Sequence, residues 1–339
     1  MKKVVSSILS VVLAVFVTVG CSTTPQGIST EEKSINVYKG KVDYKELPKK
    51  LGNVPKASKK YKIGVVLKTL NNEHWQEMKK GYEDAAKKYG VNIEIQAAKD
   101  EGDLTGQLNL AETMLNKGYD LLSISPLSTT NLLPVLNNAK SRGVPVLNVD
   151  DSRVNAHVFV GGDHREMGVL AADYIHKLLP NGGKVAQVEG LSGSPAAIQR
   201  TEGFKNALKK YDNLQLVASQ PGNWDRLKAQ EVATNILKAH PDIKAFYANN
   251  DTMALGVVEA LKNAGKKDVI VIGTDGVPNA ISSIRKGELT ATIGTFPYYM
   301  GYTAVEVGLR VLEGQKVPNT IVTKQLIVDK ENVDEHFPE

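Results

Sequence analysis

The chain has 339 residues, of which 42% are hydrophobic and 23% are charged. These proportions are ordinary for a soluble globular protein, and the length allows one large domain or two medium ones. The formal net charge of +5 is mild, and the single cysteine excludes both an internal disulfide and Cys-x-x-Cys metal motifs. The one dense basic cluster, KKLGNVPKASKKYK over residues 49–62, is interpreted as a linker, so no nucleic-acid partner is expected.

The N-terminus has the features of an export signal. Two lysines precede an apolar run over residues 4–19, which has the length of a signal-peptide core and is too short and poorly flanked for a transmembrane helix. The run ends in VTVGC, which resembles the lipobox of bacterial lipoproteins, although Thr18 stands where Leu or Val is usual. The resemblance implies that residues 1–20 are a cleaved signal peptide and that Cys21 is lipidated; ordinary secretion is the alternative.

The segment that follows is predicted to be a flexible tether. Residues 21–60 are rich in Ser, Thr, Pro, Gly and Lys and show little apolar periodicity. We expect this tether to hold the folded part of the chain off a membrane surface.

From Tyr61 onward, short β-rich runs alternate with helical patterns of roughly ten to fifteen residues. Ten strands are predicted, over residues 62–67, 92–97, 119–125, 144–150, 157–162, 183–190, 214–219, 243–249, 268–275 and 290–296. Strand–helix alternation of this kind indicates parallel sheets built from right-handed βαβ units.

An internal repeat relates the two halves of this region. Residues recur with a displacement of 122 at separated places, in the pairs Gly81 and Gly203, Ala85 and Ala207, Asp103 and Asp225, Leu115 and Leu237, and Asp120 and Asp242. The runs VPVLNVDD and VIVIGTDG align at a displacement of 125, which sets Asp150 against Asp275. We infer two similar α/β lobes, each with a doubly wound sheet, rather than one continuous large sheet.

In open parallel sheets, ligands bind outside the carboxyl ends of the strands. The polar and aromatic residues that follow the apolar runs include Lys68, Asn72, His74, Trp75, Asp150, Asp151, Arg200, Trp224, Asn250, Asp275 and Thr295. Both tryptophans of the chain belong to this set. Indole faces pack against the C–H faces of a sugar ring, while Asp accepts, Arg and Lys donate, and Asn does both toward its hydroxyls. The set therefore predicts a site for a sugar or polyol.

Structural roles remain open for these residues at this point. The tryptophans could be core residues, Asp150 and Asp275 could cap helices, and Arg200 could be a solvated helix residue. The histidines show no His-x-x-x-His pairing, so no metal site is expected. Nucleophile-elbow, phosphate-loop and dinucleotide motifs are missing from the sequence, so we expect neither a cofactor nor catalysis.

Five motifs carry a family resemblance. They are VVLKTLNNEHWQEMKKGYEDAAKKYGV, GSPAAIQRTEGF, ASQPGNWDRLKA, ANNDTMALGVVEAL and VIGTDGVP, and they resemble the ribose/allose branch of bacterial periplasmic sugar-binding proteins. The likeness extends over residues 61–328. It implies a class I periplasmic binding protein fold, in which a three-segment hinge joins two lobes that close on a monosaccharide and deliver it to an ABC importer.

The resemblance also implies roles for particular residues. The family's ligand contacts fall on Lys68, Asn72, Trp75, Asp150, Arg200, Trp224, Asn250 and Asp275. Where the family commonly has Pro and Phe, this chain has Glu73 and His74; Asp151 replaces a common Arg and Thr295 a common Gln. We include His74, Asp151 and Thr295 among the predicted ligand-binding residues and expect these replacements to alter the ligand preference.

These observations together predict the organisation of the chain. The signal peptide (1–20) and the lipid-anchored tether (21–60) precede an N-terminal lobe (61–163 with 296–323) and a C-terminal lobe (164–295 with 324–335). The resemblance implies crossings near residues 163, 296 and 324.

The predicted function is capture of a monosaccharide or polyol, allose-, ribose- or xylose-like, by a monomeric extracytoplasmic lipoprotein for the membrane subunits of an ABC importer. One alternative is a binding protein that signals to a membrane sensor kinase or chemoreceptor, and another is an enzyme acting on a sugar. A sugar-responsive repressor would need a DNA-reading helix pair where this chain has an export signal.

Overall fold

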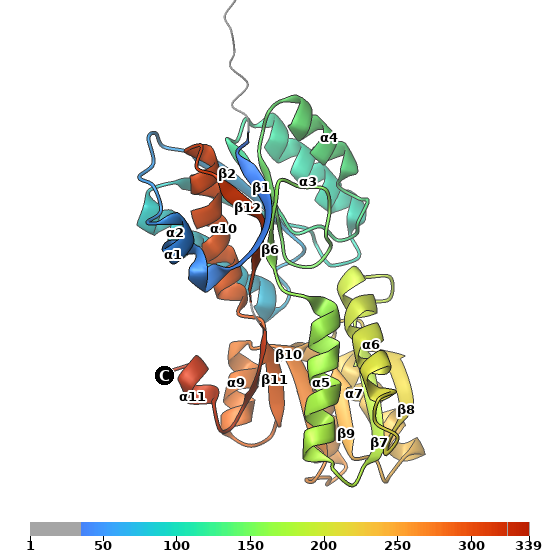
Figure 1. The fold of residues 1–339 in the computed structure, drawn as a ribbon. Coiled ribbons are helices and arrows are strands. Elements are labelled where there is room, and N and C mark those ends of the chain that lie inside the picture. Colours follow the sequence, from blue (N-terminus) through green and yellow to red (C-terminus); the bar gives the residue numbers. More distant parts are fainter. Residues whose placement is uncertain (1–34, 324, 339) are drawn as a thin grey trace, which may run out of the picture. The chain divides into compact units, whose positions relative to one another are not determined.

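The computed structural model describes residues 35–323 and 325–338, which form two α/β lobes (Figure 1). The predicted signal peptide and Cys21 lie outside the described residues. Among the helices in the described part of the chain, none is long and apolar enough to cross a membrane.

The first lobe is built on a seven-stranded parallel sheet of order β1-β12-β6-β5-β4-β2-β3. Its strands are β1 (Val37–Asp43), β2 (Lys62–Leu67), β3 (Asn92–Ala97), β4 (Leu121–Ile124), β5 (Val146–Val149), β6 (Val158–Gly161) and β12 (Val317–Val322). Its helices are η1 (Tyr44–Glu46), α1 (Leu47–Leu51), α2 (Glu73–Tyr89), α3 (Leu104–Asn116), α4 (Leu133–Ser141) and α10 (Pro297–Leu312).

The second lobe is built on a six-stranded sheet of order β13-β11-β10-β9-β7-β8, in which only the pairing of β13 with β11 is antiparallel. Its strands are β7 (Gly183–Glu189), β8 (Leu214–Pro221), β9 (Ala245–Ala248), β10 (Ile270–Asp275), β11 (Ala291–Gly294) and β13 (Leu326–Asp329). Its helices are α5 (His164–Leu178), α6 (Pro195–Leu208), α7 (Arg226–Ala239), α8 (Asp251–Asn263), α9 (Pro278–Arg285) and α11 (Val333–His336).

Both faces of each sheet are covered by helices. Side chains that alternate along a strand therefore enter different hydrophobic cores. In β2, Val65 packs with residues of α2 and α10, whereas its neighbour Val66 packs with residues of α3 and α4. In β7, Val188 packs with α7 and α8, whereas Val185 packs with α5 and α6. This burial on both faces explains why the strands read as continuous apolar runs.

The chain passes between the lobes three times, after β6, after β11 and after β12. The fold class expected from the sequence is thereby confirmed: two doubly wound α/β lobes with three connecting segments. All ten predicted strands are present, and β1, β12 and β13 were not predicted.

The predicted tether is wrong over residues 37–51. β1 pairs in parallel with β12 from Val37 to Asp43, and Leu47 in α1 is buried in the core of the first lobe. The lysines of β1 obscured this strand in the sequence, because an edge strand tolerates a polar face and its pairing partner is about 280 residues away.

The internal repeat corresponds to matching helix contacts. A Cβ at Gly81 in α2 would lie 1.9 Å from the carbonyl oxygen of Tyr298 at the start of α10, and a Cβ at Gly203 in α6 would lie 2.1 Å from that of Arg165 in α5. Both α10 and α5 are the first helices after a crossing between lobes. The repeated glycines therefore allow the same close helix pairing in each lobe.

Candidate functional site

The carboxyl ends of the strands bring the predicted residues to one place between the lobes. Asn72 caps α2, because its Oδ1 accepts a hydrogen bond from Trp75 N at 3.4 Å. Asn250 caps α8 in the same way, accepting from Met253 N at 2.9 Å. Both capping asparagines also line the cavity described next.

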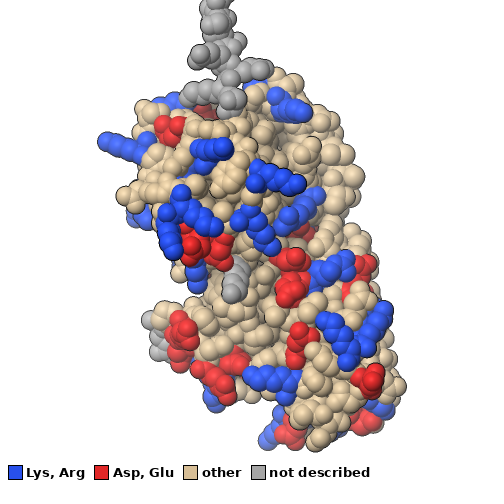
Figure 2. Space-filling model, viewed as in Figure 1, with Lys and Arg blue, Asp and Glu red and all other residues tan. Residues whose placement is uncertain are grey.

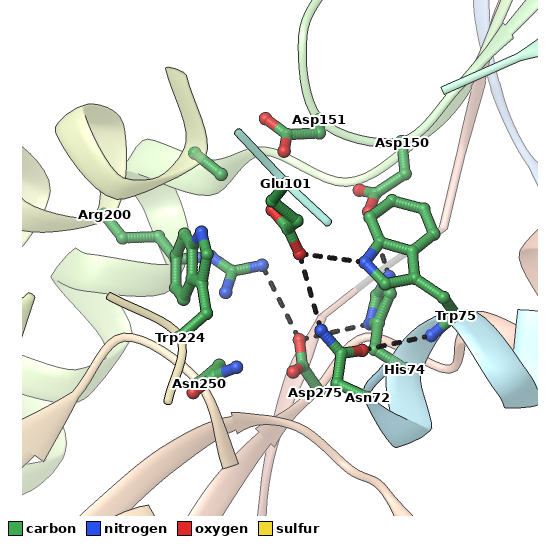
Figure 3. Close-up of a pocket in the computed structure, with 11 residues that line it drawn as sticks. Asn72, His74, Trp75, Glu101, Asp150, Asp151, Arg200, Trp224, Asn250 and Asp275 are labelled. Carbon is green, nitrogen blue, oxygen red and sulfur yellow. Dashed lines mark hydrogen bonds and ion pairs between the residues drawn. The ribbon is translucent and has the colours of Figure 1, made fainter. Parts of the chain in front are cut away.

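A cavity of about 30 Å³ lies between the strand ends of the two lobes (Figure 3). Its wall consists of Asn72, His74, Trp75, Glu101, Asp150, Asp151, Ala196, Arg200, Trp224, Asn250 and Asp275. Nine of these eleven residues were predicted from the sequence. The volume suffices for about one or two water molecules and is far below the roughly 300 Å³ at which ligand pockets begin. A sugar can therefore enter only when the wall moves apart.

His74 joins the two lobes across this cavity. Its Nε2 lies 3.0 Å from Asp150 Oδ2 in the first lobe, and its Nδ1 lies 3.2 Å from Asp275 Oδ1 in the second (Figure 3). Burial alone would lower the pKa of His74, but the two carboxylates outweigh burial and raise this pKa to about 10. The ring is therefore a cation at neutral pH, held between two acids.

Each of these two carboxylates has a second basic partner. His164 Nε2 lies 3.4 Å from Asp150 Oδ1, and an Arg200 terminal nitrogen lies 3.7 Å from Asp275 Oδ1. Burial would raise the pKa of Asp150, yet the hydrogen bonds from His164 and His74 hold it well below its usual value. Burial also lowers the pKa of His164, which therefore stays neutral and accepts from Arg200 Nε at 3.3 Å.

A second charged group adjoins Trp75. Lys68 is fully buried and pairs with Asp151, and its Nζ lies 4.0 Å from Glu101 Oε2. Glu101 in turn accepts hydrogen bonds from Trp75 Nε1 at 3.0 Å and from Asn72 Nδ2 at 3.4 Å. These contacts fix the orientation of the Trp75 indole.

The two indoles lie on opposite sides of the cavity, Trp75 from the first lobe and Trp224 from the second (Figure 3). The Trp224 ring packs over Gly190, where a Cβ would lie 2.1 Å from the indole. The Arg200 guanidinium lies 5.8 Å from the Trp224 ring centroid. Three buried polar atoms of the wall, His74 Nδ1, Asp151 Oδ1 and Trp224 Nε1, form no hydrogen bond by geometry among the described residues, and the contact of His74 Nδ1 with Asp275 is an ion pair.

The site also concentrates unusual backbone conformations. Non-glycine residues with positive φ in the described part of the chain are Asp150, Asp151, Asn223, Trp224, Asp275 and Phe296. Four of the six line the cavity. Such conformations are costly for residues with a Cβ and cluster where a ligand is clamped.

The structure separates the alternatives that the sequence left open. Neither Asp150 nor Asp275 caps a helix, because the caps of α5 and α9 are Asp163 and Val277. Arg200 is buried and not a solvated helix residue. Trp75 is deeply buried and packs with the core of the first lobe as well as lining the cavity, whereas Trp224 is half-buried.

Two predicted residues lie behind the cavity wall. Lys68 reaches the cavity only through Asp151 and Glu101, and Thr295 donates from its hydroxyl to the carbonyl oxygen of Asp275 at 3.2 Å. The sequence interpretation missed Glu101 and His164. Glu101 lies four residues beyond the end of β3, so a wider search after each strand would have found it.

Among the described residues, no group of three or more His, Cys, Asp or Glu side chains has the geometry of a metal site. The acids of the cavity wall are instead paired directly with Lys68, His74 and Arg200. This arrangement suits binding of a neutral, hydroxyl-rich molecule, because the charged groups that line the cavity can exchange a protein partner for a hydroxyl.

Comparison with known proteins agrees with this geometry. The family model described as "Periplasmic binding protein domain" matches residues 63–316. The chain belongs to the periplasmic binding protein family. The family resemblance found in the sequence is thereby confirmed.

Two curated relatives and one solved structure show how far the similarity of this periplasmic binding protein extends. The D-allose-binding periplasmic protein of Escherichia coli is 42% identical over 264 residues, covering 75% of this chain and 85% of that protein. The ribose import binding protein of Bacillus subtilis is 36% identical over 323 residues, covering 95% of this chain and 97% of that protein. A solute-binding protein of an ABC transporter from Actinobacillus succinogenes, solved with bound D-allose, is 32% identical with a TM-score of 0.78, covering 81% of this chain and 100% of that one.

Membership in this family establishes the general role. The chain is an extracytoplasmic solute-binding protein, and its family consists of binding proteins rather than enzymes.

Proposed function

We propose that this protein captures a monosaccharide or polyol in the cleft between its lobes and delivers it to the membrane subunits of an ABC importer. The observation that carries the proposal is the pair of indoles, one from each lobe, facing each other across a cavity walled by hydrogen-bonding charged groups. Flat apolar faces above and below a ring, with charged partners around its edge, are what a sugar ring requires. The relatives named for D-allose and ribose support the same ligand class.

Each predicted residue has a proposed task in this clamp. Trp75 and Trp224 stack on the two faces of the ring. Asp150, Asp151, Asp275, Asn72, Asn250 and Arg200 contact its hydroxyls, and His74 contributes a ring nitrogen. Lys68 and Thr295 act from behind the wall, where Lys68 orients Asp151 and Thr295 orients the backbone of Asp275.

The remaining parts of the proposal concern the whole chain. Residues 1–20 are a signal peptide, lipid on Cys21 anchors the protein outside the cytoplasmic membrane, and the protein acts as a monomer. The lobes hinge at the crossings near residues 163, 296 and 324. Support comes from the apolar run ending in VTVGC and from the three connecting segments of the fold.

We propose that the cleft binds its ligand without chemical change. A sugar-cleaving site pairs a carboxylate with a carboxylic acid whose pKa is raised. Asp150 and Asp275 are instead both partnered by the His74 cation, and the pKa of Asp150 is held well below its usual value. Asp150 is therefore not prepared to donate a proton.

The test is calorimetric titration against a panel of pentoses, hexoses and inositols. We expect saturable one-to-one binding of at least one member of the panel. If no sugar or polyol binds while a different class of solute does, the proposed ligand class is wrong.

A further inference from the structure

Charge is divided unevenly along the chain. Residues 35–60 carry eight lysines and two acidic residues, whereas residues 61–339 carry 31 basic and 33 acidic residues. The first segment therefore has a formal charge of +6 and the remainder −2. All eight lysines are exposed, and within the described part of the chain Lys59 alone of the eight forms an ion pair, with Asp120. We call the surface formed by residues 35–60 the basic flank.

The basic flank is part of the folded lobe. β1 is paired along its length with β12, and Leu47 lies in the core. Arg310 donates hydrogen bonds to the carbonyl oxygens of Leu51 and Gly52, at 3.4 and 2.8 Å. Figure 2 shows Lys and Arg gathered over the part of the first lobe where β1 and α1 lie. Because this backbone is part of the folded lobe, its lysines hold defined positions, and Lys39 and Lys41 lie beside the same hollow.

A hollow beside β1 adds depth to this surface. It has a volume of about 470 Å³ and is bordered by Lys39, Lys41 and Arg153, together with Asp151 and Asp163. Both carboxylates are already engaged, Asp151 by Lys68 and Asp163 by backbone N–H groups of α5. With Asp151 neutralised by Lys68, the hollow offers three cations against the one remaining carboxylate of Asp163, in a space large enough for a phosphate group.

We propose that the basic flank binds the anionic phospholipid headgroups of a membrane, so that the first lobe lies on the membrane surface. An exposed lysine near an anionic bilayer contributes about fivefold in affinity, and several together bind measurably. Cys21 and Ile35 are 14 residues apart, so an anchor at Cys21 would keep the basic flank within at most about 50 Å of the bilayer. Stable attachment of a peripheral protein commonly combines one lipid chain with one basic surface.

The test measures binding of a chain that starts at Lys33 to vesicles, because residues 33–339 form one compact unit without the predicted anchor. We expect the protein to sediment with vesicles that contain phosphatidylglycerol, to remain in solution with pure phosphatidylcholine, and to be released by high salt. Changing Lys39, Lys41, Lys49 and Lys50 to Gln should weaken binding by roughly tenfold or more. The melting temperature of the variant checks that it is folded.

The second lobe supplies a matched control. Changing the exposed lysines Lys209, Lys210, Lys266 and Lys267 to Gln removes the same charge from the other lobe and should leave vesicle binding within about twofold. Equal weakening by both sets would show unspecific attraction by net charge and overturn the proposal. Failure of the folded wild-type chain to bind anionic vesicles at low salt, or equal binding to neutral vesicles, would overturn it as well.

Discussion

His74 adds an ionic contact between the lobes to the aromatic clamp formed by Trp75 and Trp224. One imidazole ring contacts a carboxylate from each lobe, Asp150 and Asp275. The two negative charges stabilise the protonated, cationic form of the ring. Neutral His164 adjoins Asp150 and Arg200 adjoins Asp275, so charge alternates in sign from Asp150 through His74 and Asp275 to Arg200. A ligand hydroxyl that binds Asp150 Oδ2 or Asp275 Oδ1 competes with His74 for that oxygen.

The charge of His74 makes stability depend on pH in a specific direction. Its pKa is about 10 in the folded protein and about 6.5 in an unfolded chain, so the stabilisation is fully present below pH 6.5 and is lost as pH rises through 10. We compare the free energies of unfolding of the wild type and His74→Phe between these pH values. The wild-type advantage should shrink by at most about 1.4 kcal/mol per pH unit in this window. A difference that does not change with pH would show that His74 is uncharged.

At the residue scale, the sequence identified the cavity wall well because the wall residues follow apolar runs. Asp150, Asp275, Trp75 and Trp224 could be found from that position and from the pairing of aromatic with charged groups. His164 could not, because it follows a crossing and reaches Asp150 only through the tertiary fold. The burial of Lys68 behind Asp151 likewise depends on packing that no local pattern records.

At the scale of elements, the repeated glycines set how closely the helices pack. Gly203→Ala would place a methyl group 2.1 Å from the carbonyl oxygen of Arg165, so α6 must move away from α5. Overpacking of this kind should lower the free energy of unfolding by about 1–3 kcal/mol. The higher helix propensity of Ala offsets only about 1 kcal/mol of this loss. The melting temperature of Gly203→Ala should fall, and that of Asn206→Ala, at an exposed position of the same helix, should hardly change. An unchanged or raised melting temperature for Gly203→Ala would contradict the proposed close packing.

The elements that the sequence missed share a physical cause. β1, β12 and β13 lie at or near sheet edges, where one side of the strand needs no apolar residue, and β1 and β12 pair with each other across about 280 residues of sequence. The ten predicted strands are mostly covered on both faces by helices, and this burial produced the apolar runs from which they were predicted. For this fold, the sequence therefore predicted the sheet interiors better than their edges.

For the whole molecule, membrane attachment is predicted to depend on Cys21. Cys21→Ser should release the protein from cell membranes washed with high salt, because salt weakens binding through the basic flank but leaves a lipid anchor in place. The measurement is the fraction of protein in washed membranes, with mass spectrometry of the wild-type N-terminus for acyl chains. A variant that stays bound, together with a wild type that carries no acyl chain, would contradict the anchor.

The clamp requires that one ligand contact both lobes at once. Asp150 and Asp275 are related by the internal repeat, and each presents its carboxylate to the cavity from its own lobe. Asp120 and Asp242 are also related by the repeat, and each forms an ion pair with a lysine. They precede the strands β4 and β9 and so lie away from the cavity. Each lobe thus has one carboxylate at the cavity, Asp150 or Asp275, and one at the opposite ends of the strands, Asp120 or Asp242, which serves as its control.

The most direct measurement is calorimetric titration of Asp150→Asn, Asp275→Asn, Asp120→Asn and Asp242→Asn with a sugar that binds the wild type. Loss of a charged hydrogen bond in a closed cleft should cost about 1.5–3 kcal/mol, so each of the first two variants should bind roughly ten- to 150-fold more weakly. The two control variants should bind like the wild type. Wild-type affinity in a folded Asp150→Asn or Asp275→Asn variant would show that the ligand does not lie between the lobes.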